Sequence, residues 1–147
     1  MKKLTIVLMF LLVSCGYKPI FSKNDQLILE FKKIITNGNN RINKQIINNV
    51  SLKENLSSDH ELTLTTDYKI EETSKNSKGQ VETYRSIIIT QLSIKKGGKI
   101  LKSNNFINEF SYNNKDNKFE LIQYQNEIKN NLINKSSEEI ILFLNLS

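Results

Sequence analysis

The chain has few of the residues that crosslink a fold or carry out catalysis. Its 147 residues include one cysteine, one histidine, one proline and no tryptophan or alanine. A single thiol excludes a disulfide within the chain and a metal site built from several thiolates. The missing alanine accompanies an abundance of asparagine, lysine and isoleucine. Because AT-rich codons encode these three residues, we interpret the bias as genomic and without functional meaning.

No group of residues has the pattern of a catalytic or metal site. His60 stands in a predicted polar loop, where we expect a solvated side chain rather than a general base. The carboxylate pairs Glu71–Glu72 and Glu138–Glu139 are adjacent in sequence, which suits surface charge. Gly97–Gly98 lies in a predicted hairpin rather than before a helix, so it does not form a phosphate-binding loop. We therefore expect a protein that is not an enzyme and that needs no metal or cofactor.

The N-terminus has the pattern of an export signal. Met1–Lys3 is basic, and Leu4–Val13 is apolar apart from Thr5. This run is shorter than the roughly 20 residues that a membrane-spanning helix needs, but it suits a signal peptide. Leu12–Cys15 resembles the bacterial lipobox, in which cleavage precedes a cysteine whose nucleophilic sulfur receives diacylglycerol. The alternative is an ordinary signal peptide with a chance cysteine.

Cleavage before Cys15 predicts three segments: a signal peptide at 1–14, a lipidated N-terminus and tether at 15–26, and a single domain at 27–147. Cys15 would carry a diacylglycerol and an N-acyl chain such as palmitate, and several acyl chains anchor a protein stably. Gly16 stands where an aspartate often marks inner-membrane retention. We therefore expect the chain at the periplasmic face of the outer membrane.

The formal net charge of the chain is +6, which bears on the partners that it could bind. A basic surface can bind nucleic acid, but an exported, lipid-anchored chain meets none. Anionic lipid headgroups or glycolipid phosphates are the available partners. A solvated surface is the alternative interpretation for most of the lysines.

The first part of the domain predicts a strand and then a helix. Residues 27–34 have the length and composition of a strand, and residues 36–40 hold turn residues that end it. From Arg41 onward, apolar residues recur at spacings of three and four. This period predicts an amphipathic helix that continues to about Leu56.

Three long strands and a second helix are predicted next. Residues 61–72 alternate between two faces, and residues 80–94 and 100–113 form further strands around the glycine-containing turn at 95–99. A helix that either Asp116 or Asn117 could cap then carries an apolar stripe, and Asn117 with Glu120 resembles a capping box. Without crossover helices, the three later strands should form an antiparallel meander that both helices cover. An open edge strand of this length would pair with something unless it is covered.

Six segments together resemble a known family. They are "CGYKPIF", "RINKQIINNV", "DYKI", "YRSIIITQLSI", "GGKIL" and "FSYNNKDNKFELIQYQNEI". In order and spacing they are similar to the landmarks of the lipopolysaccharide-assembly lipoprotein LptE, in its alphaproteobacterial form. The chain departs from that family in its last helix, which lacks the usual alanines. The resemblance implies an α+β fold class, with two helices packed on a four-stranded mixed sheet in the order strand, helix, three strands, helix.

The resemblance also implies a function. LptE-like proteins sit as a plug inside the outer-membrane β-barrel LptD, help to assemble it, and assist the passage of lipopolysaccharide to the outer leaflet. The expected partners are therefore an LptD-like barrel and lipopolysaccharide. Tyr17, Pro19 and Phe21 would set the exit of the lipidated tether, with Pro19 fixing φ.

Candidate residues for lipopolysaccharide contact come from physical chemistry alone. Ammonium groups in strand connections could reach anionic phosphates or sugar acids, and the candidates are Lys75, Lys78, Lys95, Lys96 and Lys99. The alternative is that these lysines only keep the surface soluble. Arg85 falls within a strand, where a structural or barrel-facing contact is expected.

Two other classes of function stay open. The first is a periplasm-facing, lipid-anchored structural tether or ligand-binding module that has no barrel partner. The second is a lipid-anchored hydrolase, which would need a pocket with converging titratable groups, and no such pocket is predicted.

Overall fold

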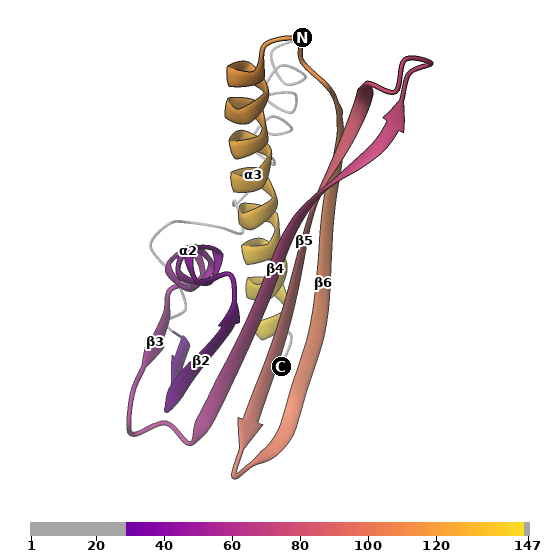
Figure 1. Cartoon of the computed structure of the whole chain (residues 1–147). Helices are drawn as coiled ribbons and strands as arrows, with labels where there is room; N and C mark the ends of the chain where they lie inside the picture. Colours follow the sequence, from indigo (N-terminus) through magenta and orange to yellow (C-terminus); the bar gives the residue numbers. More distant parts are fainter. Residues whose placement is uncertain (1–28, 146–147) are drawn as a thin grey trace, which may run out of the picture.

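A computed structural model describes residues 29–145 (Figure 1). The predicted α+β class is confirmed: two helices accompany a four-stranded mixed sheet, and two short strands form a separate pair. The elements are β1 (Leu29–Phe31), β2 (Lys33–Gly38), α2 (Asn40–Val50), β3 (Leu52–Glu54), β4 (His60–Lys75), β5 (Val81–Lys96), β6 (Lys99–Asn113) and α3 (Lys118–Asn145). The predictions for Cys15, Gly16 and the tether lie outside the described residues.

The main sheet has the strand order β2-β4-β5-β6. β2 runs parallel to β4, while β4, β5 and β6 form the predicted antiparallel meander. Between β5 and β6, Lys96 pairs with Lys99, so Gly97 and Gly98 form a two-residue turn. Both glycines have positive φ, 55° and 78°, as a tight hairpin turn of this type requires.

Both helices cover the same face of the sheet. On β4, Leu62, Leu64 and Thr66 are buried, and their partners on β5 are Ile94, Leu92 and Thr90. The stripe predicted for α3 is buried against β5 and β6, while α2 packs on β2, β4 and α3. The opposite face of the sheet carries no helix among residues 29–145 (Figure 1).

The segment around α2 differs from the sequence prediction in three ways. The single strand predicted at 27–34 is two strands, β1 and β2, which belong to different sheets. Strand β2 does not end before Thr36 but continues to Gly38, because it pairs with β4 along that length. The helix ends at Val50 rather than near Leu56. Ser51 adopts a left-handed conformation, with φ 60°, and its N–H bonds to the carbonyls of Asn48 and Ile47. This arrangement stops the helix and redirects the chain into β3.

β3 was not predicted, because a three-residue strand has too little periodicity to detect. It pairs in parallel with β1, and it buries Leu52 against the core. The sequence predicted His60 in a loop, but His60 is the first residue of β4. Of the two caps predicted for α3, the structure shows Asn117, whose side chain accepts hydrogen bonds from the N–H groups of Phe119 (2.9 Å) and Glu120 (3.4 Å).

Neither α2 nor α3 has the length and apolar character that crossing a bilayer would demand. Within residues 29–145, no three acidic, histidine or cysteine side chains gather in a way that could hold a metal ion.

Candidate functional site: a polar cleft at the hairpin end of the sheet

The β4–β5 hairpin extends past the end of β6. Pairing between β5 and β6 ends at Thr83 and Asn113, whereas β4 and β5 stay paired as far as Lys75 and Val81. Asn76 organises the turn, because its Oδ1 accepts hydrogen bonds from the N–H groups of Lys78 (2.9 Å) and Gln80 (3.0 Å). A short asparagine side chain that bonds to the backbone in this way stabilises a tight turn. The hairpin tip is therefore held in a defined shape.

The connection from β6 to α3 is tied to this hairpin through Asn114. Its backbone N–H donates to the Glu82 carbonyl at 2.7 Å, and its side-chain Nδ2 donates to the Val81 carbonyl at 2.8 Å. The Asn114 Oδ1 accepts a hydrogen bond from the Lys115 N–H at 2.8 Å. The two bonds from Asn114 to Glu82 and Val81 join segments that lie about thirty residues apart in sequence.

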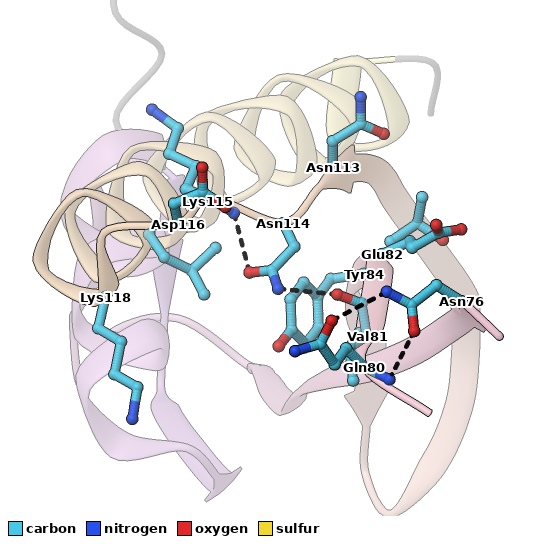
Figure 2. A pocket seen from close by; sticks show the side chains of 12 residues that line it. Asn76, Gln80, Val81, Glu82, Tyr84, Asn113, Asn114, Lys115, Asp116 and Lys118 are labelled. Carbon is cyan, nitrogen blue, oxygen red and sulfur yellow. Dashed lines mark hydrogen bonds between the residues drawn. The ribbon is translucent and has the colours of Figure 1, made fainter. Parts of the chain in front are cut away.

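A cleft of about 680 Å³ lies between the hairpin, this connection and the first turns of α3 (Figure 2). Its lining is mostly polar, with amides, two ammonium groups, two carboxylates and the ring of Tyr84. The lining residues are Asn76, Gln80, Val81, Glu82, Thr83, Tyr84, Asn113, Asn114, Lys115, Asp116, Lys118 and Leu121. Such a surface can donate to and accept from hydroxyl groups, and its lysines can bind anions.

Two lysines of the cleft, Lys115 and Lys118, were missed by sequence reasoning. Lys115 extends over the ring of Tyr124, with its Nζ 4.7 Å from the ring centre, which orients the ammonium group. The segment "NNKDNK" holds both lysines, but by itself it indicates only the passage from strand to helix. Nothing local in that segment indicates that it meets the β4–β5 hairpin.

The structure divides the five predicted lysines between two ends of the sheet. Lys75 and Lys78 belong to the β4–β5 hairpin, near the cleft, and Lys75 forms an ion pair with Glu72 at 3.0 Å. Lys95, Lys96 and Lys99 belong to the opposite hairpin. β5 has 16 residues, and at roughly 3.3 Å per residue its ends lie about 50 Å apart. The five lysines therefore cannot hold one phosphate group together.

In the distal group, Lys96 already has an acidic partner. Its Nζ lies 2.5 Å from Asp59 Oδ2, and His60 Nδ1 lies 2.8 Å from Asp59 Oδ1. The hydrogen bond from Lys96 holds the pKa of Asp59 below its ordinary value. An exposed pair of this kind contributes little to stability, and it leaves Lys96 less available for an external anion.

Arg85 lies on the sheet face that carries no helix, because its neighbours Ser86 and the other even-numbered residues of β5 point toward the helices. Its guanidinium is 3.8 Å from the Glu109 carboxylate on β6. Glu71, its cross-strand neighbour on β4, is paired with Lys69 at 2.6 Å. Arg85 thus forms an ion pair between β5 and β6, which is a structural contact, and a contact with a barrel stays a prediction.

Comparison with protein families finds no family that matches this chain. Comparison with curated proteins likewise finds no match. Solved structures do share the fold. Rare lipoprotein B from Shewanella oneidensis aligns with a TM-score of 0.59 at 10% identity, over 75% of this chain and 91% of that chain. Lipoprotein B from Nitrosomonas europaea aligns with a TM-score of 0.56 at 8% identity, over 77% and 81% of the two chains.

A minor lipoprotein from Acinetobacter baumannii gives a similar result, with a TM-score of 0.54 at 12% identity. It covers 77% of this chain and 90% of its own. Identities this low establish similarity of fold only. The chain has the fold of these bacterial lipoproteins.

Proposed function

We propose that this chain is an outer-membrane lipoprotein, anchored through acyl groups on Cys15, that plugs and helps to assemble an LptD-type β-barrel. In that place it would assist the insertion of lipopolysaccharide into the outer leaflet. The observation that carries the proposal is the agreement between two independent features. The lipobox-like Leu12–Cys15 predicts a lipoprotein from sequence, and the fold is shared with solved bacterial lipoproteins.

The cleft supports contact with a phosphorylated glycolipid. Its amide groups can hydrogen-bond sugar hydroxyls, and Lys115 and Lys118 can pair with phosphates. Lys78 and Lys75 stand on the adjoining hairpin, although Lys75 is paired with Glu72, so four ammonium groups lie at one end of the sheet. Glu82 and Asp116 also line the cleft, and they would repel phosphates from part of it.

The sheet face without a helix supports the plug arrangement. Toward the Lys96 end, two of its rows are uncharged and polar, with Thr63 paired to Ser93 and Thr65 paired to Gln91. The lumen of a large outer-membrane barrel is polar, so this part of the face could lie against it without burying a charge.

The test is a mild-detergent purification of the C-terminally tagged protein from outer membranes of the native bacterium. We expect recovery of a large outer-membrane barrel in stoichiometric amount. A tagged Cys15→Ser variant is the matched control, because it cannot be acylated and should no longer fractionate with the outer membrane. Recovery of the lipoprotein alone would instead support the second candidate, a lipid-anchored tether or ligand-binding module without a barrel.

A further inference from the structure

Three large apolar side chains are exposed at the end of the sheet where β5 turns into β6. Ile100 (61% exposed) and Leu101 (57%) follow that turn, and Leu56 (89%) lies in the connection between β3 and β4. Both segments stand at the bottom of Figure 1, because His60 at the start of β4 pairs with Lys96 at the end of β5. Exposed apolar residues that gather in one place mark a surface for interaction.

A β-bulge lies at the two apolar residues of the hairpin. Ile100 pairs with Lys95 and Lys102 pairs with Ile94, so Leu101 is an extra residue of β6 without a partner on β5. Successive residues of a regular strand point to opposite faces, whereas a bulge bends the strand and redirects a side chain. The hairpin thus presents two adjacent apolar side chains to the solvent.

Leu56 occupies the second position of a fixed turn. The Asn55 carbonyl accepts a hydrogen bond from the Ser58 N–H at 2.9 Å, and the Asn55 Oδ1 accepts one from the Ser57 N–H at 2.9 Å. The Asn55 N–H donates to the Phe31 carbonyl at 2.8 Å, which ties the turn to β1. The leucine therefore projects from a turn that β1 holds in place.

The charges at this end are mainly positive. We define the Lys96 end as residues 30–33, 53–61 and 94–102, which contain seven lysines and four carboxylates. Half-buried Lys95 and exposed Lys99 form no ion pair with any of residues 29–145, although Lys95 stands opposite Glu61 on β4. The opposite end, residues 72–83 and 113–120, contains four lysines and four carboxylates. An excess of positive charge therefore distinguishes the Lys96 end.

The expected lipid anchor also favours this end. Fourteen residues, 15–28, separate the start of the mature chain from β1, and they could span at most about 50 Å. β1 is three residues long and ends beside the Asn55 turn, so it starts roughly 10 Å from the Lys96 end. The other end lies about 50 Å away along β5. It could touch the membrane only if the tether were almost straight.

We propose that Leu56, Ile100 and Leu101 insert into the surface of the membrane that holds the acyl groups of Cys15, with the lysines of the Lys96 end against anionic phospholipid headgroups. Apolar side chains flanked by ammonium groups suit the membrane interface, where the long lysine stems keep the charge at headgroup level. The inference rests on the acylation of Cys15, which is part of the proposed function, but it needs no barrel.

The test places a fluorophore at each end of the mature lipoprotein. Cys15 is the one cysteine of the chain, so its acylation leaves the thiol of Leu101→Cys as the single site for a nitrobenzoxadiazole label. Phe119→Cys is the matched control, because Phe119 is also apolar and exposed (74%) but lies in the first turn of α3. Both variants are checked for folding by circular dichroism.

The labelled proteins are reconstituted into vesicles of phosphatidylethanolamine with about a quarter phosphatidylglycerol, a part of which carries brominated acyl chains that quench the label. We expect quenching at position 101 to be at least about threefold stronger than at position 119, because an interfacial segment enters the boundary of the acyl chains. Detergent micelles without bromine give the unquenched signal.

A second pair of variants tests the role of charge. Lys95→Gln with Lys99→Gln, added to the labelled Leu101→Cys chain, should reduce the quenching by about half or more, because these ammonium groups attract anionic lipid. Lys75→Gln with Lys78→Gln removes the same charge from the opposite end and should leave the quenching unchanged.

Three results would overturn the inference. They are equal quenching at positions 101 and 119, a label at position 101 that self-association shields but brominated lipid does not quench, and equal effects of the two lysine pairs. The mass of the mature chain reports acylation separately. An acylated chain without quenching at position 101 would remove this inference and leave the proposed function standing. Quenching there without recovery of a barrel would remove the plug and leave the membrane contact.

Discussion

Thr66 and Asn43 form a buried hydrogen bond that fixes α2 on the sheet. The Thr66 hydroxyl donates to Asn43 Oδ1 at 2.8 Å, and each residue has only 1% of its surface exposed. The Asn43 Nδ2 then donates to the Asn37 carbonyl in β2, also at 2.8 Å. One side chain of the helix thus satisfies polar groups from two neighbouring strands, β2 and β4.

Replacing Asn43 should therefore lower the free energy of unfolding more than replacing a surface asparagine does. We expect Asn43→Ala to lower the free energy of unfolding by about 2 kcal/mol, because the Thr66 hydroxyl and the Asn37 carbonyl lose a buried partner. Asn48→Ala, on the exposed side of the same helix, should change it by no more than about 0.5 kcal/mol. Urea denaturation measures both. Equal effects would show that the buried bond adds nothing beyond helix propensity.

Gly38 is predicted to tolerate no side chain. Its φ is +79°, and a Cβ there would lie 2.0 Å from the Thr66 carbonyl oxygen. Gly79 has nearly the same φ, +77°, but a Cβ there would meet nothing within 4 Å. Gly79→Ala should lower the free energy of unfolding by about 1 kcal/mol, from backbone strain alone. Gly38→Ala should lower it by more than about 3 kcal/mol, because the two backbones must also separate. Equal losses of stability in the two variants, measured by thermal or urea unfolding, would contradict the predicted clash at Gly38.

The pair Asp59–Lys96 should be visible in a pH titration. Because the Lys96 ammonium stabilises the carboxylate, the pKa of Asp59 in the folded chain lies below its ordinary 3.8. This interaction is present above the unfolded-state pKa and is lost as the pH falls through the folded one. In Lys96→Met, NMR titration of the Asp59 carboxyl should give a pKa closer to 3.8. In Lys99→Met, a change in the same hairpin, the pKa of Asp59 should stay lowered. An unchanged pKa of Asp59 in Lys96→Met would argue against the pairing of Asp59 with Lys96.

Charge reversal should show whether the cleft or the distal hairpin is the glycolipid-binding site. We expect the double variant Lys115→Glu, Lys118→Glu to weaken binding of purified lipopolysaccharide about tenfold. The double variant Lys95→Glu, Lys99→Glu carries the same change in net charge and should have a smaller effect. Binding should also weaken with added salt, since exposed charges are screened. Equal losses in the two variants would indicate attraction by net charge rather than by the cleft.

Much of the fold could be predicted from local patterns. The alternation from Leu62 to Ile70 assigns a strand and its buried face, and the spacing along α3 assigns its buried stripe, because each pattern repeats with the period of its own element. Gly97–Gly98 likewise marks the two-residue turn by composition. These features depend on neighbours within a few residues, so a single sequence carries them.

The errors around α2 arise where local signals compete with pairing. The apolar and polar residues after Val50 could continue the helical period, but Leu52 is instead buried through β3 and its partner β1. Likewise, Thr36–Gly38 has turn residues, but hydrogen bonding to β4 keeps it extended. Long-range pairing overrides weak local preference in both places.

Local sequence patterns are enough to identify the lipobox-like N-terminus, the order of the long elements and the residues of each that point inward. The meeting of the β4–β5 hairpin with the β6–α3 connection, which places Lys115 and Lys118 in one cleft, depends instead on the fold. The fold also decides that Lys75 and Lys99 belong to opposite ends of the sheet. The physical reason is register: the pairing of β5 with both neighbours sets which distant residues become adjacent, and strand length sets which stay apart.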